Sequence, residues 1–179
     1  MMVNGKNEDC AEAGVETNRA SAPGSAGRWL LLATGIIILD RVTKVLASQY
    51  LTLHEPQALF PSLNLTLVHN TGAAFSLLGQ AGGWQRWLFI FLATAVSLGI
   101  VVWLLKTPAE RPWFACALAL ILGGAVGNLW DRVVSGHVVD FIDVFYEGWH
   151  WPAFNIADAA ITVGAAMILY DGLKRDVST

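Results

Sequence analysis

Two long stretches without a charged residue constrain this chain more than any other feature. Residues 87–105 (WLFIFLATAVSLGIVVWLL) and residues 112–130 (PWFACALALILGGAVGNLW) each run for 19 residues without Asp, Glu, Lys or Arg. A helix needs about 20 mostly apolar residues to cross the hydrocarbon core of a bilayer. Both stretches are therefore predicted to be membrane-spanning helices.

Two further stretches are apolar but carry charged groups near their ends. Asp40, Arg41 and Lys44 interrupt the second half of one, and Asp158 and Asp171 lie near the two ends of the other. Together the four stretches predict an all-α integral membrane protein. Its predicted spans are residues 28–50, 86–105, 112–131 and 156–173 within a membrane domain of residues 28–175, followed by a C-terminal end at 176–179.

The first 27 residues differ in kind from the rest of the chain. They are rich in Gly, Ala, Ser, Asn and acidic residues and show no apolar periodicity, which predicts a disordered tail over residues 1–27. No basic segment leads directly into a short apolar run with a cleavage site, so we do not expect a signal peptide.

The overall composition excludes several classes of protein. Only 14% of the residues are charged, against about 25% in an ordinary soluble domain, and 55% are hydrophobic. This excludes a disordered or collagen-like chain, and a net charge of −3 argues against a nucleic-acid partner. Cys10 lies in the polar tail and Cys116 in an apolar stretch, so no disulfide is expected.

The distribution of Lys and Arg predicts the orientation in the membrane. Neither residue type occurs between Tyr50 and Gly83 or between Val133 and Asn155, the two longer loops. The opposite ends of the spans carry basic residues, namely Lys106, Arg111, Lys174 and Arg175. Because basic residues accumulate on the cytoplasmic side, both termini are predicted to be cytoplasmic and the longer loops extracytoplasmic. Arg86 is an exception on the outer side.

The outer loops are predicted to form a small platform at the membrane surface. Residues 62–68 (SLNLTLV) alternate apolar and polar side chains, which is typical of a half-buried strand. Tryptophans near the outer ends of the spans suit the headgroup level of a bilayer, namely Trp84, Trp87, Trp149 and Trp151. A mobile loop remains the alternative interpretation.

Ionisable and amide side chains gather at the same outer ends of the predicted spans. Asp40 and Lys44 are four residues apart on one helix face and can pair. Asn155 and Asp158 share a face at the start of the last span. The others are Asn128, Asp131, Arg132, Asp140 and Asp143. Ionisable groups at the edge of a bilayer are costly, so this convergence predicts a functional site.

The residue types at these ends narrow the possible chemistry. The four histidines form no H-x-x-x-H pair and have no Cys partner, so no metal is expected. No G-x-S-x-G turn seats a serine nucleophile, and no G-x-x-x-x-G-K-[ST] loop binds phosphate. Two close carboxylates remain, and such a pair shares one proton, so that one acts as base and the other as acid. This is the chemistry of an aspartic protease.

Simpler interpretations of the same residues remain open. Asp158 could be only a capping acid of the last helix. Asp131 and Arg132 could form only a local ion pair. Asp40 and Lys44 could only neutralise each other so that the first helix inserts.

Other classes of protein also remain open. A small ion-coupled carrier would use membrane acids as a proton relay, although the chain shows no internal duplication of the kind that repeat-built transporters have. A structural subunit is a third possibility. The small residues Ala119, Gly123 and Gly127 form a ridge that is expected to pack helices together rather than bind a ligand.

Five stretches of the chain, in order and spacing, resemble the bacterial lipoprotein signal peptidases, also called signal peptidase II. The resemblance covers about residues 28–175 and excludes only the tail. The five stretches are Asp40-Arg-Val-Thr-Lys44, Asn70-Thr-Gly-Ala-Ala-Phe75, Gly123-Gly-Ala-Val-Gly-Asn128-Leu-Trp-Asp131-Arg132, Val138-Val-Asp140-Phe141 and Phe154-Asn155-Ile-Ala-Asp158.

The resemblance implies a fold, a reaction and a set of partners. The fold is four transmembrane helices with a small extracytoplasmic β-platform and a short surface helix. The reaction removes signal peptides from prolipoproteins that carry a diacylglyceryl group, cutting just before the lipidated cysteine. The resemblance further implies the bacterial inner membrane, contact with membrane lipid, a monomer, no cofactor, and inhibition by globomycin-type cyclic peptides.

The resemblance also assigns roles to individual residues. Asp140 and Asp158 would be the catalytic dyad. Asp143, three residues after Asp140, is the competing candidate, and the V-V-D-F register favours Asp140. The residues expected to bind substrate or to orient and support the site are Asn70, Gly72, Asn128, Arg132, Asn155, Asp40, Lys44 and Asp131.

Overall fold

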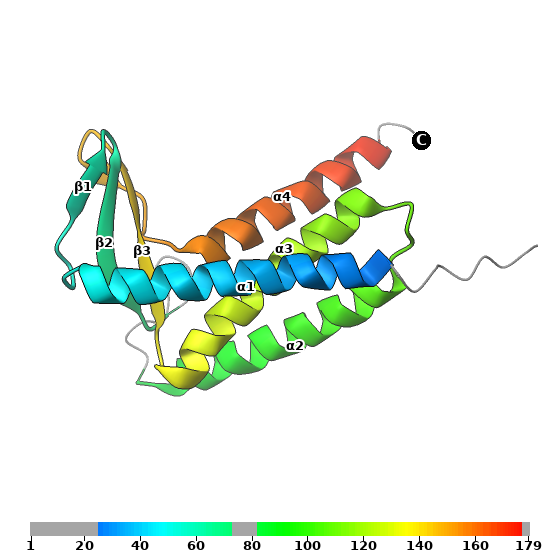
Figure 1. Cartoon of the computed structure of the whole chain (residues 1–179), viewed down its shortest axis with the longest axis horizontal. Coiled ribbons are helices and arrows are strands. Elements are labelled where there is room, and N and C mark those ends of the chain that lie inside the picture. The colour runs from blue at the N-terminus through cyan, green and yellow to red at the C-terminus, as the bar shows by residue number, and fades with distance from the viewer. Residues whose placement is uncertain (1–24, 73–81, 177–179) are drawn as a thin grey trace, which may run out of the picture.

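The computed structural model describes residues 25–72 and 82–176. Its helices are α1 (Ser25–Tyr50), α2 (Trp84–Lys106), α3 (Pro112–Val134) and α4 (Ile156–Asp176). Its strands are β1 (Gln57–Phe60), β2 (Leu63–Asn70), β3 (Val138–Tyr146) and β4 (Trp149–His150). The helices run alongside one another, and the sheet stands across one end of them (Figure 1). The start of α1 and the end of α4 lie at the opposite end.

Three of the four predicted spans are confirmed as helices that are long and apolar enough to cross a membrane. They are α2, α3 and the part of α4 up to Lys174. Helix α1 has 26 residues and is long enough, but its charged residues exclude it from that group, so its crossing stays a prediction. Helix α1 begins at Ser25, and residues 1–24 of the predicted tail lie outside the described part.

Helix α3 is the central helix and packs against the other three. Pro112 suits its first turn, where a missing backbone N–H costs nothing. Small residues allow close approach: a Cβ atom at Gly123 would lie 2.7 Å from the Cβ of Ile36 on α1, and one at Gly124 would lie 2.3 Å from the carbonyl oxygen of Ala157 on α4. The small-residue ridge therefore packs helices, as predicted.

The sheet is antiparallel, with the order β1-β2-β3-β4. The predicted strand over residues 62–68 is confirmed as β2, which continues to Asn70. It pairs with β3 so that Val68 lies opposite Asp140 and Asn70 opposite Val138. The platform is thus an ordered sheet where it is described, not a mobile loop.

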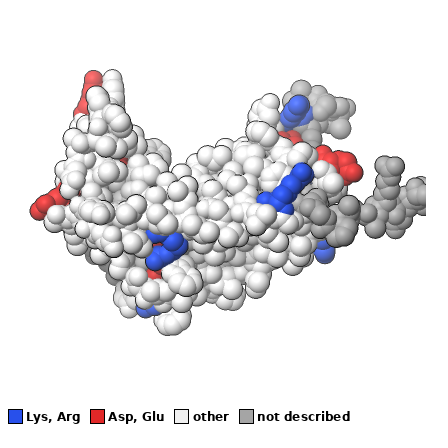
Figure 2. All heavy atoms as spheres, viewed as in Figure 1, with Lys and Arg blue, Asp and Glu red and all other residues white. Residues whose placement is uncertain are grey.

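Other expectations for the outer region have mixed outcomes. Beyond α1 to α4, no helix occurs in the described ranges, so the short surface helix has no counterpart there, and residues 73–81 lie outside them. The four tryptophans expected at the headgroup level are all exposed. On the face that Figure 2 shows, charged side chains gather toward the two ends and an uncharged surface separates them. That distribution fits a membrane-embedded chain.

Candidate active site

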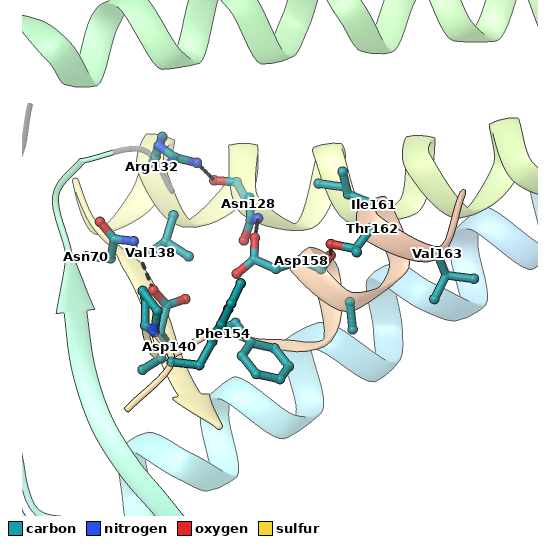
Figure 3. A pocket seen from close by; sticks show the side chains of 14 residues that line it. Asn70, Asn128, Arg132, Val138, Asp140, Phe154, Asp158, Ile161, Thr162 and Val163 are labelled. Carbon is teal, nitrogen blue, oxygen red and sulfur yellow. Dashed lines mark hydrogen bonds between the residues drawn. The ribbon is translucent and has the colours of Figure 1, made fainter. Parts of the chain in front are cut away.

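A cavity of about 670 Å³ opens at the sheet end of the helices, between α3, α4, β3 and the segment before α4. Five of the predicted site residues line it, and their side chains converge on it in Figure 3. These are Asn70, Asn128, Arg132, Asp140 and Asp158. The rest of the wall is mostly apolar, from Trp151 to Phe154 and along α4 to Val163. The cavity therefore joins a polar end to an apolar groove.

Asp140 enters the cavity from strand β3 and is 2% exposed. Its Oδ1 accepts a hydrogen bond from Asn155 Nδ2 at 2.7 Å, and its Oδ2 accepts one from Asn70 Nδ2 at 3.0 Å. Burial, and next the negative charge of Asp158, raise the pKa of Asp140 to about 7, although both amide donors and Lys44 act in the opposite direction. Near neutral pH the carboxyl of Asp140 can thus carry a proton.

Asp158 lies in the first turn of α4, and Asn155 caps that helix. The side-chain oxygen of Asn155 accepts the backbone N–H of Asp158 at 2.9 Å, and Asp158 Oδ2 accepts the backbone N–H of Asn155 at 3.3 Å. This reciprocal pair is a capping box. The capping interpretation is therefore correct but incomplete, because Asp158 also lines the cavity.

Asn128 orients the carboxylate of Asp158. Its Oδ1 accepts hydrogen bonds from Lys44 Nζ at 2.9 Å and from Asn155 Nδ2 at 3.2 Å. Since two donors hold the oxygen, the amide nitrogen faces Asp158 and donates to its Oδ1 at 2.7 Å. The position of Asp158 thus depends on a buried lysine that does not itself line the cavity.

Lys44 is the centre of a buried ionic cluster. Its Nζ lies 2.8 Å from Asp40 Oδ2, which confirms the predicted pairing on α1, and 2.8 Å from Asp131 Oδ2 on α3. Asp40 also accepts the backbone N–H of Ala157 at 3.0 Å, and Asp131 accepts that of Val139 at 3.3 Å. The cluster therefore joins α1 and α3 to the segments that carry both candidate carboxylates. The pair of Asp40 and Lys44 thus does more than neutralise charge so that helix α1 inserts.

Arg132 binds main-chain oxygens rather than its neighbour. It donates to the carbonyl oxygen of Gly72 at 2.9 Å and to that of Asn128 at 3.3 Å. Gly72 N–H in turn donates to Asn70 Oδ1 at 2.9 Å, which turns the amide nitrogen of Asn70 toward Asp140. The carboxylate of Asp131 binds Arg41 and Lys44, so the alternative of a local Asp131–Arg132 ion pair does not hold.

Asp143 belongs to a different cluster. Its carboxylate accepts a hydrogen bond from Asn64 Nδ2 at 3.0 Å and lies 2.8 Å from Nδ1 of His150. Side chains three residues apart on a strand point to opposite faces, which separates Asp143 from Asp140. Asp143 is also absent from the cavity wall.

Sequence reasoning missed the structural roles of Arg41 and Arg86. Arg86 donates to the carbonyl oxygens of Arg132 at 2.8 Å and Val133 at 2.9 Å, the free carbonyls at the end of α3. Its exceptional position on the outer side was the signal that could have pointed to this role.

Within residues 25–72 and 82–176, no three His, Cys, Asp or Glu side chains are grouped to hold a metal ion.

Comparisons with known proteins agree with one another. A family model described as signal peptidase (SPase) II matches residues 32–174. A lipoprotein signal peptidase of Teredinibacter turnerae is 50% identical over 149 residues, covering 83% of this chain and 89% of that protein. One of Paraburkholderia phymatum is 47% identical over 154 residues, covering 86% and 92%. A solved structure described as that of a bacterial membrane enzyme has a TM-score of 0.77 at 32% identity, covering 86% of this chain and 92% of that one.

Proposed function

Because the chain belongs to the signal peptidase II family, we propose that it is an aspartic endopeptidase that cuts prolipoproteins just before their diacylglyceryl-modified cysteine. The observation that carries this proposal is that Asp140 and Asp158 face one cavity and are bridged by a single residue, Asn155. Two carboxylates held in this way can share one proton.

The raised pKa of Asp140 supports an assignment of the two roles. Asp158, ionised, takes a proton from a water molecule as the water oxygen attacks the scissile carbonyl carbon. Asp140, protonated, gives its proton to the carbonyl oxygen, and a gem-diol forms. Asp158 then protonates the leaving nitrogen, the C–N bond breaks, and Asp140 recovers a proton from one hydroxyl. Both carboxyls return to their starting states.

The location of the cavity suits such a substrate. The signal peptide is apolar and the modified cysteine carries two acyl chains, so both sides of the scissile bond stay in the bilayer. The apolar wall along α4, which includes Ile161 and Val163, can contact such a substrate, while the polar end meets water. We also propose that the protein works as a monomer in contact with membrane lipid and that globomycin-type cyclic peptides compete for this cavity.

The proposed orientation puts both termini in the cytoplasm and the active site near the outer face of the bacterial inner membrane. The sheet lies at the end opposite to the start of α1 and the end of α4 (Figure 1). The basic residues Lys106 at the end of α2, Arg111 just before α3 and Lys174 near the end of α4 belong to the helix ends away from the sheet. A reporter fused after Arg175 should report cytoplasm, and one inserted between Tyr50 and Leu63 should report the outer side. The reverse pattern would contradict the orientation.

Purified full-length protein tests the function directly. Mixed in detergent with a diacylglyceryl-modified prolipoprotein, it should release the signal peptide by one cut before the modified cysteine, located by mass spectrometry. A precursor with the cysteine changed to alanine serves as the control and should stay intact. No cleavage of the lipidated precursor by folded protein would contradict the proposal and favour a carrier or a structural subunit.

A further inference from the structure

Helix α2 contacts Arg132 at two points. The guanidinium carbon of Arg132 lies 5.1 Å from the ring centroid of Phe89, in cation–π contact. Arg86, one turn earlier on the same face of α2, donates to the carbonyl oxygen of Arg132 at 2.8 Å. The first turns of α2 therefore hold both the side chain and the main chain of Arg132.

A continuous series of contacts leads from Arg132 to the dyad. Arg132 donates to the carbonyl oxygen of Gly72 at 2.9 Å, and Gly72 N–H donates to Asn70 Oδ1 at 2.9 Å. Asn70 Nδ2 then donates to Asp140 Oδ2 at 3.0 Å. Each bond orients the donor or acceptor that makes the next one, so the position of the Arg132 guanidinium contributes to how firmly Asn70 holds Asp140.

Within the described part of the chain, Arg132 has no direct ion pair that could hold it in place. Its contacts are the two carbonyl oxygens and the ring of Phe89. Cation–π attraction strengthens as the cation is removed from water, and Arg132 is partly buried at this end. The Phe89 ring is thus a principal restraint on the guanidinium.

We propose that Phe89, through its aromatic face, and Arg86, through its guanidinium, are positioning residues that hold Arg132 in the geometry required for cleavage. The proposal rests on the proposed function. Neither residue lines the cavity, so both act through Arg132 and not on the substrate.

Substitutions at Phe89 separate the aromatic face from simple apolar packing. Phe89→Leu removes the face and keeps an apolar side chain, whereas Phe89→Tyr keeps the face. We expect about tenfold lower kcat for Phe89→Leu, since a cation–π contact to a partly buried cation is of that order, and near-normal kcat for Phe89→Tyr. Phe91→Leu is the matched control, because Phe91 is 69% exposed on the same helix, and it should behave as the unmodified protein.

The pH profile of kcat/KM gives a readout that a merely structural role would not move. Charged groups facing Asp140 are Asp158 from α4, Lys44 from α1 and Arg132 from α3. The bond from Asn70 favours the ionised form of Asp140, so loosening it raises the pKa of that carboxyl. Phe89→Leu should therefore move the alkaline limb to higher pH, and Phe91→Leu should not.

Several outcomes would overturn the proposal. An equal loss of kcat in Phe89→Leu and Phe89→Tyr would show that packing matters and the aromatic face does not. An unchanged kcat and pH profile in Phe89→Leu would show that Phe89 has no positioning role. If Phe89→Leu does not fold, Arg86→Lys decides, because lysine lacks the guanidinium fork with which Arg86 bonds two carbonyl oxygens through separate nitrogens. Arg86→Lys should move the same alkaline limb to higher pH, and an unchanged limb would overturn the proposal. Cleavage by the unmodified protein is measured first, so these results are distinct from a failure of the proposed function.

Discussion

The side-chain amide of Asn155 donates a hydrogen bond to Asp140 Oδ1 at 2.7 Å, so the residue that caps helix α4 also holds a carboxylate of strand β3. Asn155 is fully buried, and its backbone and side chain make the capping box with Asp158 as well. One asparagine therefore fixes both candidate catalytic groups. The start of the helix and the geometry of the dyad are built by the same contacts.

The pH dependence of cleavage should report the protonation of Asp140. Its pKa is raised to about 7, and the proposed mechanism requires it protonated, so kcat/KM should fall as the pH rises through about 7. Asn70→Ala removes a donor that favours the ionised form, which raises the pKa of Asp140 further and moves this limb to higher pH. A kcat/KM profile from pH 5 to 9 measures both. A limb that moves to lower pH in Asn70→Ala would contradict the assignment.

The same carboxyl should lower the stability of the fold as the pH rises through about 7. Asp140 has a pKa of about 7 in the folded protein against 3.8 in the unfolded chain, so the folded state binds more protons between these values and loses stability as the pH rises through them. The full effect is about 4 kcal/mol at most. The difference in Tm between Asp140→Asn and the unmodified protein should therefore become more positive from pH 5 to pH 8. Thermal unfolding in detergent measures it, and a difference that does not change with pH would contradict this account.

Lys44 should be essential for folding even though it lies outside the cavity. Lys44→Met leaves Asp40 and Asp131 with less compensation in a buried site, a change that costs about 3–5 kcal/mol. We expect a large loss of folded protein in the membrane and partial recovery in the double variant with Asp40→Asn. Abundance and detergent Tm measure the effect.

The more exposed ion pair between Arg111 and Asp171 supplies a control for Lys44. Asp171→Asn breaks an ion pair at the other end of the helices. Ion pairs that solvent reaches contribute about 1 kcal/mol or less to the free energy of unfolding. Near-normal abundance is expected. If Asp171→Asn and Lys44→Met lower abundance and Tm equally, the buried cluster has no special role in folding.

The helices and strand β2 could be predicted because their signals are local. Uncharged runs of 19 residues gave α2 and α3, and alternation gave β2. The stretch that forms β3 was interpreted only as apolar. In the structure its first four residues, from Val138 to Phe141, are all buried, so burial does not alternate along it as it does in a half-buried strand. Whether such a run is a strand depends on its partners in space, which the sequence does not show.

The candidate site could be predicted only in part. The four-residue spacing of Asp40 and Lys44 predicts their contact. Asp131 and Arg132 are adjacent on a helix and do not face each other, so the carboxylate of Asp131 binds Arg41 and Lys44 instead. Once β3 is known to be a strand, the three-residue spacing puts Asp140 and Asp143 on opposite faces of it. Which face meets Asp158 follows from the packing of β3 against α3 and α4, and only the resemblance to a family favoured Asp140.

Cleavage of a diacylglyceryl-modified prolipoprotein by three purified variants tests the dyad most directly. Asp140→Asn and Asp158→Asn each remove a proton donor or acceptor, so each should lower kcat by at least about 100-fold while folding normally. Asp143→Asn keeps the hydrogen-bonding shape beside Asn64 and His150 and should retain most activity. An inactive Asp143→Asn together with an active Asp140→Asn would contradict the central claim.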